Sequence, residues 1–159
     1  MLNWIKFLSI FLFTLFVTIT IIVFYQAEKP FASTRDAAMD LVLSEGALTT
    51  VDRADIYHGT AALVSVYGTD EKGKNKVILV DEKAGKVVRT ITPSTGITKQ
   101  QAADIVKKED KVQKILHTSL GMEKENLFWE VTYLGEDDSL NYVYLNFKDG
   151  KWQKRIMHL

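Results

Sequence analysis

The sequence has no cysteine among its 159 residues and only two prolines, Pro30 and Pro93. The lack of cysteine excludes disulfide bonds, thiolate catalysis and cysteine-ligated zinc or iron–sulfur centres. It permits a location outside the cytoplasm but does not indicate one. Any chemistry that this chain performs must therefore come from other side chains.

The sequence also lacks a run of charges of one sign. Its 20 basic and 20 acidic residues cancel, and they are interleaved, as in Asp70-Glu71-Lys72. A surface that follows nucleic-acid phosphates needs clustered lysine and arginine. The charge pattern therefore argues against nucleic-acid binding and predicts a mixed, solvated surface.

Recognisable catalytic motifs are missing as well. The serine signatures S-x-x-K, K-T-G and G-x-S-x-G do not occur, which removes the usual serine nucleophiles of wall enzymes. The segment Gly68 to Asn75 resembles a phosphate-binding loop, but Asn75 replaces the Ser or Thr that binds magnesium. This loop is also predicted to join two strands, whereas a phosphate loop joins a strand to a helix.

The histidines and paired carboxylates show no useful spacing. The histidines are far apart and form no H-x-x-x-H or H-x-x-E-H pattern, and the carboxylate pairs fall in or beside predicted turns, where acidic residues are common. These residues are His58, His117 and His158, and Asp137, Asp138, Glu123 and Glu125. We therefore predict a protein that is not an enzyme, with no catalytic, cofactor-binding or metal-binding residues.

The most distinctive feature that is present is an apolar run from Phe7 to Ala27 without a charged side chain. At about 1.5 Å per residue, a helix of this length crosses the ~30 Å hydrocarbon layer of a membrane. Lys6 is the only charge in residues 1–27, so the positive-inside bias places the N-terminus in the cytoplasm and residues 28–159 outside. The alternative is a cleaved signal peptide, but the end of the run has no small-x-small site. We predict a retained, single-pass anchor.

After the anchor, the sequence predicts a first module over residues 28–92. Ala38, Leu41 and Val42 share one stripe of a helix within residues 32–43, and Gly46 ends it. Three strand-like runs follow, separated by polar turns, at about residues 56–67, 76–81 and 86–91. This order predicts a helix packed on a three-stranded antiparallel meander.

A second module over residues 93–159 repeats this order. Thr98 can cap a helix that we expect to continue, or to restart, through Val112, Ile115 and Leu116 to a stop at Gly121. Three strands are predicted at about 127–134, 141–147 and 151–157. Residues recur as well as elements. Val64, Tyr67 and Gly68 correspond in order to Val131, Leu134 and Gly135, and the spacing is the same for all three pairs. We interpret the pattern as a tandem repeat with residues 92–96 as the linker; the alternative is a chance likeness of two ordinary hairpins.

The candidate binding residues lie in the second module. Trp129, Val131 and Tyr133 share one face of a strand and are core candidates. Tyr142 and Tyr144 point the other way on the next strand, so they either lie under the neighbouring module or form an exposed aromatic surface. We take Tyr142, Tyr144 and Trp152 as candidate partner-binding residues, each of which can instead belong to the core.

Taken together, these features resemble the TseB-like family of cell wall elongation regulators from Gram-positive bacteria, whose C-terminal part is a PepSY-type, cystatin-like module. The resemblance covers essentially the whole chain. It is carried by the N-terminal anchor, the helix opening at Thr98 to Ala102, the strand Phe128-Trp129-Glu130-Val131, and the segments Tyr142-Val143-Tyr144 and Asp149-Gly150-Lys151.

The resemblance implies an extracytoplasmic protein that binds a membrane-anchored penicillin-binding protein, a peptidoglycan transpeptidase, and modulates wall synthesis during elongation. It brings no catalytic residues, cofactor or small-molecule substrate. PepSY modules also occur in peptidase propeptides. The alternative function is therefore an inhibitor or regulator of a secreted or membrane peptidase.

Overall fold

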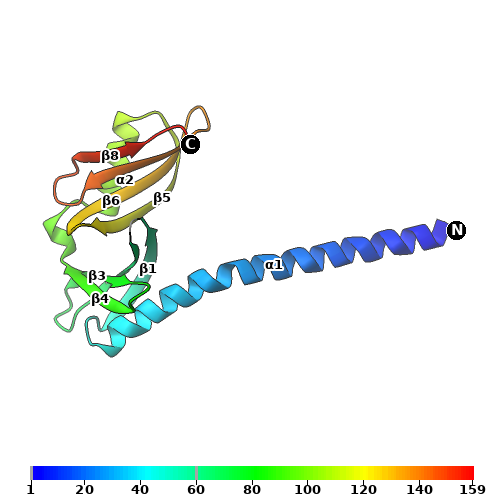
Figure 1. Cartoon of the computed structure of the whole chain (residues 1–159), viewed down its shortest axis with the longest axis horizontal. Coiled ribbons are helices and arrows are strands. Elements are labelled where there is room, and N and C mark those ends of the chain that lie inside the picture. Colours follow the sequence, from blue (N-terminus) through cyan, green and yellow to red (C-terminus); the bar gives the residue numbers. More distant parts are fainter. Residues whose placement is uncertain (1, 60) are drawn as a thin grey trace.

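A long helix and two antiparallel sheets make up the structure, a computed structural model that describes residues 2–59 and 61–159, without the side chains of residues 2, 3 and 27–31. Figure 1 shows the helix extending away from a body that contains both sheets. In chain order the elements are α1 (Leu2–Ser44), β1 (Thr50–His58), β2 (Ala62–Thr69), β3 (Asn75–Asp81), β4 (Lys86–Ile91), the 3-10 turn η1 (Pro93–Thr95), α2 (Lys99–Glu109), β5 (Val112–Glu123), β6 (Asn126–Gly135), β7 (Leu140–Asn146) and β8 (Trp152–Ile156).

Helix α1 is continuous from the predicted anchor into the predicted first module. Its segment Trp4–Gln26 is long and apolar enough to cross a membrane, with a mean hydropathy of 2.7, and none of it is buried against the rest of the protein. Thr14, Thr18 and Thr20 each donate a side-chain hydrogen bond to the carbonyl four residues earlier, which satisfies their hydroxyls within the helix. The side chains of Ala27 and of the flanking charges Glu28 and Lys29 lie outside the described residues.

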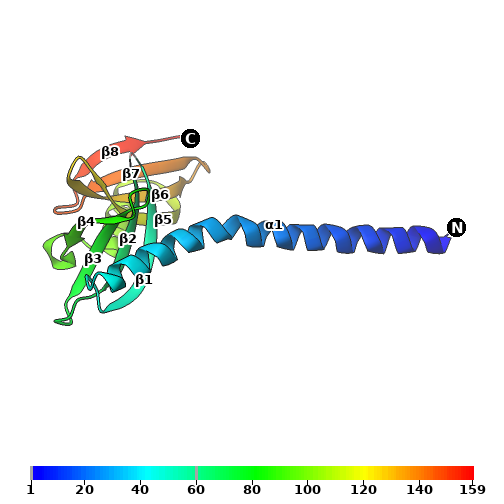
Figure 2. The ribbon, with the colours of Figure 1, turned by 60° about the horizontal axis from the view of Figure 1, so that its bottom comes forward.

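The helix passes through Pro30, although proline removes a backbone donor and crowds the preceding turn. Figure 2 shows α1 bending between its two halves, as expected for a helix that contains a proline. We expected the anchor helix and the helix over residues 32–43 as separate elements. The structure instead joins them into one α1 that runs from the apolar segment to the first sheet.

Each sheet has four strands in sequence order, β1-β2-β3-β4 in sheet 1 and β5-β6-β7-β8 in sheet 2. All neighbouring strands are antiparallel. The predicted α+β class and the antiparallel meanders are therefore confirmed, but the prediction of three strands in each sheet is wrong. A strand was missed at the start of both sheets.

In sheet 1, the predicted run 56–67 is two strands, β1 and β2, that pair with each other from Thr50 opposite Thr69 to His58 opposite Ala62. Thr60, in the middle of that run, lies outside the described residues. β1 carries the charges Asp52, Arg53 and Asp55, so it lacks the hydrophobic alternation that marks a half-buried strand.

In sheet 2, the predicted helix ends earlier than expected. Thr98 forms the predicted N-cap as part of a complete capping box with Gln101. The helix stops at Glu109, however, and residues 112–123 form the long strand β5. The expected continuation to Gly121 is therefore wrong.

Sheet 1 lies between two layers. One of its faces packs on the C-terminal part of α1, in a core made of Ala38, Val42, Leu48, Val64, Val66, Ile78 and Val80. Its other face shares a second core with sheet 2 and α2, to which Tyr57, Leu63, Val77 and Leu79 contribute from sheet 1. The first unit (the C-terminal part of α1 with sheet 1) and the second unit (α2 with sheet 2) are thus packed against each other through buried apolar side chains.

Two polar contacts also link sheet 1 to the elements of the second unit. The hydroxyl of Ser65 donates to the backbone oxygen of Leu120 at 2.7 Å. Lys99, at the start of α2, forms an ion pair with Asp55 of β1 at 3.0 Å. The first contact joins sheet 1 to the edge strand β5 of sheet 2, and the second joins sheet 1 to α2.

Candidate interaction site

Helix α2 covers one face of sheet 2, and the opposite face carries the candidate site. The buried side chains Ala102 and Val106 of α2 belong to the same core as Trp129, Val131 and Tyr133. The opposite side, which we call the open face, consists of alternate residues matched across the four strands. They are His117, Ser119, Gly121, Phe128, Glu130, Thr132, Tyr142, Tyr144, Lys154 and Ile156.

One row of the open face crosses the whole sheet. Ser119 of β5 lies opposite Glu130 of β6, Glu130 lies opposite Tyr144 of β7, and Tyr144 lies opposite Lys154 of β8. Directly opposite residues in antiparallel strands have Cβ atoms about 5 Å apart, so their side chains interact. The row therefore places a hydroxyl, a carboxylate, a phenol and an ammonium group side by side.

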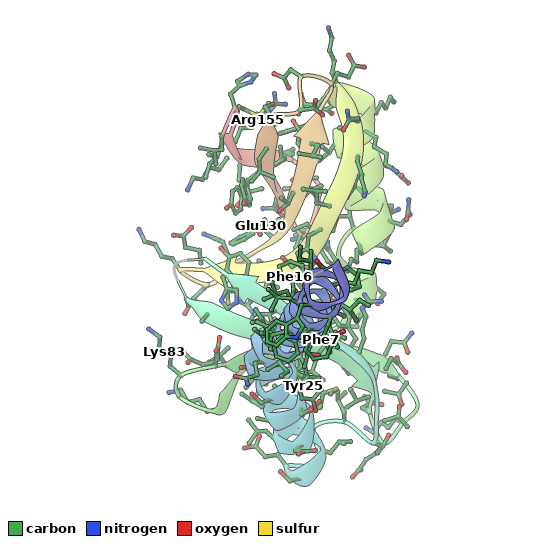
Figure 3. All side chains as sticks on the ribbon, turned by 90° about the vertical axis from the view of Figure 1, so that its right-hand side faces the viewer. Phe7, Phe16, Tyr25, Lys83, Glu130 and Arg155 are labelled. Carbon is green, nitrogen blue, oxygen red and sulfur yellow. The ribbon has the colours of Figure 1, made fainter. Side chains whose placement is uncertain are left out.

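Glu130 is the unusual member of this row, because it is a half-buried carboxylate and the only charged residue of strand β6. Burial raises its pKa above the ordinary value, while a hydrogen bond from Tyr144 and the nearby charges of His117 and His58 lower it. In the view of Figure 3, Glu130 lies near the level where the two sheets meet.

Sheet 1 closes one end of the open face with an aromatic cluster. The rings of Tyr57 and Phe128 meet edge to face at 5.5 Å between centroids, and Phe128 meets Tyr144 in the same way at 5.5 Å. Burial, and then the negative charge of Glu130, raises the pKa of Tyr57 to about 12. Burial, and then its hydrogen bond to Glu130, also raises the pKa of Tyr144.

A pocket of about 200 Å³ lies beside this cluster, between the β1–β2 hairpin and the open face. Tyr57, Phe128 and Tyr144 form its walls, and Gln153 and Lys154 contribute from β8. The Lys154 ammonium lies 5.4 Å from the centroid of the Tyr144 ring. A small pocket with aromatic walls and polar ends favours a single side chain or a similarly small group.

The three predicted binding residues do not form one surface. Tyr142 and Tyr144 share the open face, and both are half-exposed. Trp152 lies opposite Leu145, on the side of α2, where Arg155 stacks over its ring at 3.4 Å. Its indole nitrogen is buried and has no hydrogen-bond partner within the described part of the chain. Trp152 thus packs at the edge of the core, away from both tyrosines.

The carboxylates and the loop that were considered for metal or phosphate chemistry make local contacts. Among residues 2–59 and 61–159, no three histidine, aspartate or glutamate side chains gather as metal ligands would. Asp137 accepts hydrogen bonds from Ser139, and Asp138 accepts one from Gln113. The loop before Asn75 joins strands β2 and β3 as predicted, and Asp70 caps its backbone by accepting from Lys72 and Lys74.

Sequence reasoning missed Glu130, Ser119, Lys154 and Tyr57 as parts of a site. Glu130 alone gave a signal, since it is the one charge within Leu127 to Leu134. The other residues come from β1, β5 and β8. The strand register of sheet 2 places Ser119 and Lys154 in line with Glu130, and the packing of sheet 1 on sheet 2 brings Tyr57 to Phe128.

Comparison with known proteins defines the class of the chain. Residues 37–81 match the model of the cell wall elongation regulator TseB-like domain. Over 147 residues the chain is 31% identical to the probable cell wall elongation regulator TseB of Bacillus subtilis (strain 168), and the match covers 92% of this chain and 90% of that protein. The chain belongs to the TseB-like family of cell wall elongation regulators.

A solved structure supports the same assignment. The YpmB protein from Bacillus subtilis matches with a TM-score of 0.65 and 32% sequence identity, covering 77% of this chain and 95% of that one. The resemblance predicted from the sequence is therefore confirmed. Membership supports a regulatory role in cell wall elongation, and the apolar N-terminal helix fits a membrane-associated regulator.

Proposed function

We propose that this protein is a membrane-anchored, extracytoplasmic regulator of peptidoglycan synthesis that acts by binding a penicillin-binding protein, a transpeptidase of the elongation machinery. It performs no catalysis itself. The observation that carries this proposal is the open face of sheet 2, a half-exposed surface rich in tyrosine on a member of an elongation-regulator family.

The contrast between the two sheets supports binding at the open face. In each sheet the second and third strands turn one face to a helix. On the other face of sheet 1 the residues are Leu63, Ser65, Val77 and Leu79, and they pack against the second unit. On the matching face of sheet 2 they are Glu130, Thr132, Tyr142 and Tyr144. Tyrosine is enriched in protein interfaces and among the residues that carry most of their binding energy.

The anchor supports a partner in the same membrane. Two proteins confined to one bilayer meet at a high effective concentration, so a weak contact between them suffices. We propose that residues 1–27 form the anchor, that residues 28–92 connect it to the body, and that residues 93–159, as a PepSY-type module, contact the transpeptidase. In this proposal the N-terminus is cytoplasmic and residues 28–159 lie outside the cell.

Site-specific cross-linking in living cells tests the proposal. A photoreactive phenylalanine replaces Tyr142 in the full chain, and the captured proteins are identified. The matched control carries the same group at Lys108, an exposed position on α2. We expect a membrane-anchored transpeptidase to be captured from position 142 and not from position 108.

Other outcomes contradict the proposal in different ways. Equal capture from both positions, or capture of cytoplasmic proteins alone, removes the case for the open face and for its placement outside the cell. Reproducible capture of a secreted or membrane peptidase from position 142 instead supports the role of a peptidase regulator.

A further inference from the structure

A hollow of about 340 Å³ lies where the two units meet, and none of the residues that line it belongs to the open face. We call it the junction pocket. Ligand pockets of proteins have volumes of this order. Its lining comes from β4, from η1, from the β5–β6 turn with the start of β6, and from the end of β7 with the turn that follows. The lining residues are Arg89, Thr95, Glu125, Asn126, Leu127, Asn146, Phe147 and Lys148.

Two cationic side chains line the junction pocket without an acidic partner. None of the ion pairs within residues 2–59 and 61–159 includes Arg89 or Lys148. Arg89 donates from Nη1 to the backbone oxygen of Glu125 at 2.6 Å and contacts the Met122 sulfur at 3.7 Å. Neither contact uses its Nε or Nη2, which form one of the edges that a guanidinium offers to a carboxylate. The pocket therefore holds a guanidinium edge and an ammonium group that both suit an anion.

Neutral donors accompany these cations. The side-chain oxygen of Asn146 accepts from the backbone N–H of Lys148 at 2.8 Å, so its NH₂ group remains as a donor. Asn126 is exposed at the same pocket and offers a second amide. Glu125 supplies the one carboxylate of the lining, against the two cations. The lining as a whole therefore favours a ligand with negative charge.

The deeper part of the junction pocket is apolar. Leu127 is half-buried and Phe147 is only 5% exposed, whereas Arg89 and Lys148 are exposed. A small apolar group beside the anion covers this surface and removes it from water, but a bare phosphate does not. The combination of cations and apolar side chains therefore favours a carboxylate carried by a peptide over a phosphate.

The turn that holds Arg89 has an unusual backbone. Lys124 and Glu125 have φ angles of 46° and 71°, which are unfavourable for residues with side chains. A two-residue turn of this kind usually contains Asn-Gly instead. Here it presents the Glu125 oxygen to Arg89 and so holds the guanidinium at the pocket. Backbone strain of this kind is often kept at binding sites.

The junction pocket also faces away from the anchor. Figures 1 and 2 show the turn between β7 and β8, which carries Lys148, on the side of the body opposite to the N-terminus. In the membrane arrangement proposed above, this side is turned toward the cell wall. This orientation rests on the proposed function, whereas the chemistry of the pocket does not.

We propose that the junction pocket binds a peptide by its free terminal carboxylate. The carboxylate lies between Arg89 and Lys148, and a small apolar side chain of the peptide lies on Leu127 and Phe147. The site goes beyond the proposed contact with a transpeptidase, because it is a second binding site on another surface of the body.

The test measures binding of a short peptide to the full chain in detergent micelles at low ionic strength. N-acetyl-alanyl-alanine is the probe, and its C-terminal amide, which has the same shape but no charge, is the control. Inorganic phosphate is titrated separately. The amide signals of Asn126, Asn146 and Lys148 report on the pocket by nuclear magnetic resonance. We expect the acid to shift them to saturation, and the amide and phosphate to leave them nearly unchanged.

Substitutions in the lining test the assigned roles. Arg89→Met is expected to weaken binding of the acid by about tenfold or more, because a charge-assisted contact is lost. Lys148→Met lies in an exposed turn and is expected to weaken it by about three- to fivefold without changing the fold. Glu125→Gln removes a like charge and is expected to strengthen it by about two- to fivefold. Lys83→Met, in the exposed turn between β3 and β4, is the control and is expected to have no effect.

Several results overturn this inference. They are equal binding of the amide, binding of phosphate as tight as that of the peptide, and unchanged binding by Lys148→Met. An effect of Lys83→Met as large as that of Lys148→Met does so as well, since it indicates only a general effect of charge. Cross-linking from position 142 reports on the open face alone, so a failure of the proposed function and a failure of the junction pocket are seen in separate experiments.

Discussion

The hydroxyl of Ser65 on β2 donates a hydrogen bond to the backbone oxygen of Leu120 on β5 at 2.7 Å, and both residues are fully buried where the two sheets meet. This bond joins units that lie far apart in the sequence. It is surrounded by the apolar side chains of the shared core. The packing of sheet 1 on sheet 2 therefore includes a specific polar contact in addition to hydrophobic burial.

Replacing Ser65 by alanine tests that contact. We expect the free energy of unfolding to fall by about 1–2 kcal/mol, because a buried carbonyl loses its donor. Chemical denaturation of the full chain in detergent micelles, followed by circular dichroism, measures the change. Ser44→Ala removes an exposed hydroxyl that bonds within α1 and is expected to change stability by less than about 0.5 kcal/mol. If both variants lower the free energy of unfolding equally, the buried hydrogen bond contributes no more to stability than an exposed one.

The pH dependence of stability tests the state of Glu130. Burial raises its pKa in the folded chain, so the folded state keeps a proton that the unfolded chain has already released. Stability therefore falls as the pH rises from below the ordinary pKa of the carboxyl group through its raised value. Glu130→Gln removes this loss, so the variant is expected to be as stable as the wild type at pH 7, or more stable by up to about 1 kcal/mol.

Denaturation curves at pH 4 and pH 7 measure this difference, which we expect to shrink at the lower pH. Glu136→Gln is the matched control, since Glu136 is exposed in the turn after β6. If Glu130→Gln is clearly less stable than the wild type at pH 7, the carboxylate stabilises the fold and is not held there at a cost.

The capping box at the start of α2 gives a local prediction. Thr98 accepts from the backbone of Gln101, and the side chain of Gln101 accepts from the backbone of Thr98. Thr98→Ala is expected to lower stability by about 1 kcal/mol. Thr95→Ala, which removes an exposed hydroxyl in η1, provides the comparison under the same denaturation conditions. A larger loss for Thr95→Ala would contradict the assignment of the cap.

Insertions in α1 test whether the orientation of the body matters for function. Two alanines inserted after Ala32 turn the body by about 200° around the helix axis, whereas four turn it by about 40° and add about 6 Å. We expect cross-linking from position 142 to be strongly reduced by two residues and largely kept by four. Equal capture by both insertions would indicate that orientation is not fixed by the helix.

The elements that the sequence predicted well depend on local signals. The N-cap at Thr98, the turn before Asn75 and the apolar segment each follow from a few adjacent residues. The false extension of α2 has a physical cause in the bulges of β5, which shift its register between Val112 and Lys114 and again between Ile115 and His117. Those bulges break the two-residue alternation and leave Val112, Ile115 and Leu116 at helical spacing.

The candidate site was only partly predictable for a different reason. Tyr142 and Tyr144 alternate with the apolar Val143 and Leu145, so their common face could be inferred from one strand. The sequence left Trp152 open between the core and a binding surface, because its side depends on a register shift in the pairing of β7 with β8 that turns it toward α2. The pocket depends on Tyr57, which lies on β1 of the first unit and contacts Phe128 of the second unit. Such a contact between sheets has no signature in a local pattern.

The unbroken course of α1 has a mechanical consequence. About 12 residues of helix separate Gln26 from Ala38, where sheet 1 begins to pack, which corresponds to a stand-off of about 18 Å from the apolar segment. A disordered spacer of the same length would let the body take any orientation and a wide range of distances relative to the apolar segment. In the membrane-anchored arrangement that we propose, a continuous helix would instead hold the body within a limited range of heights above the lipid surface. A partner in the same membrane would then have to contact the body within that range.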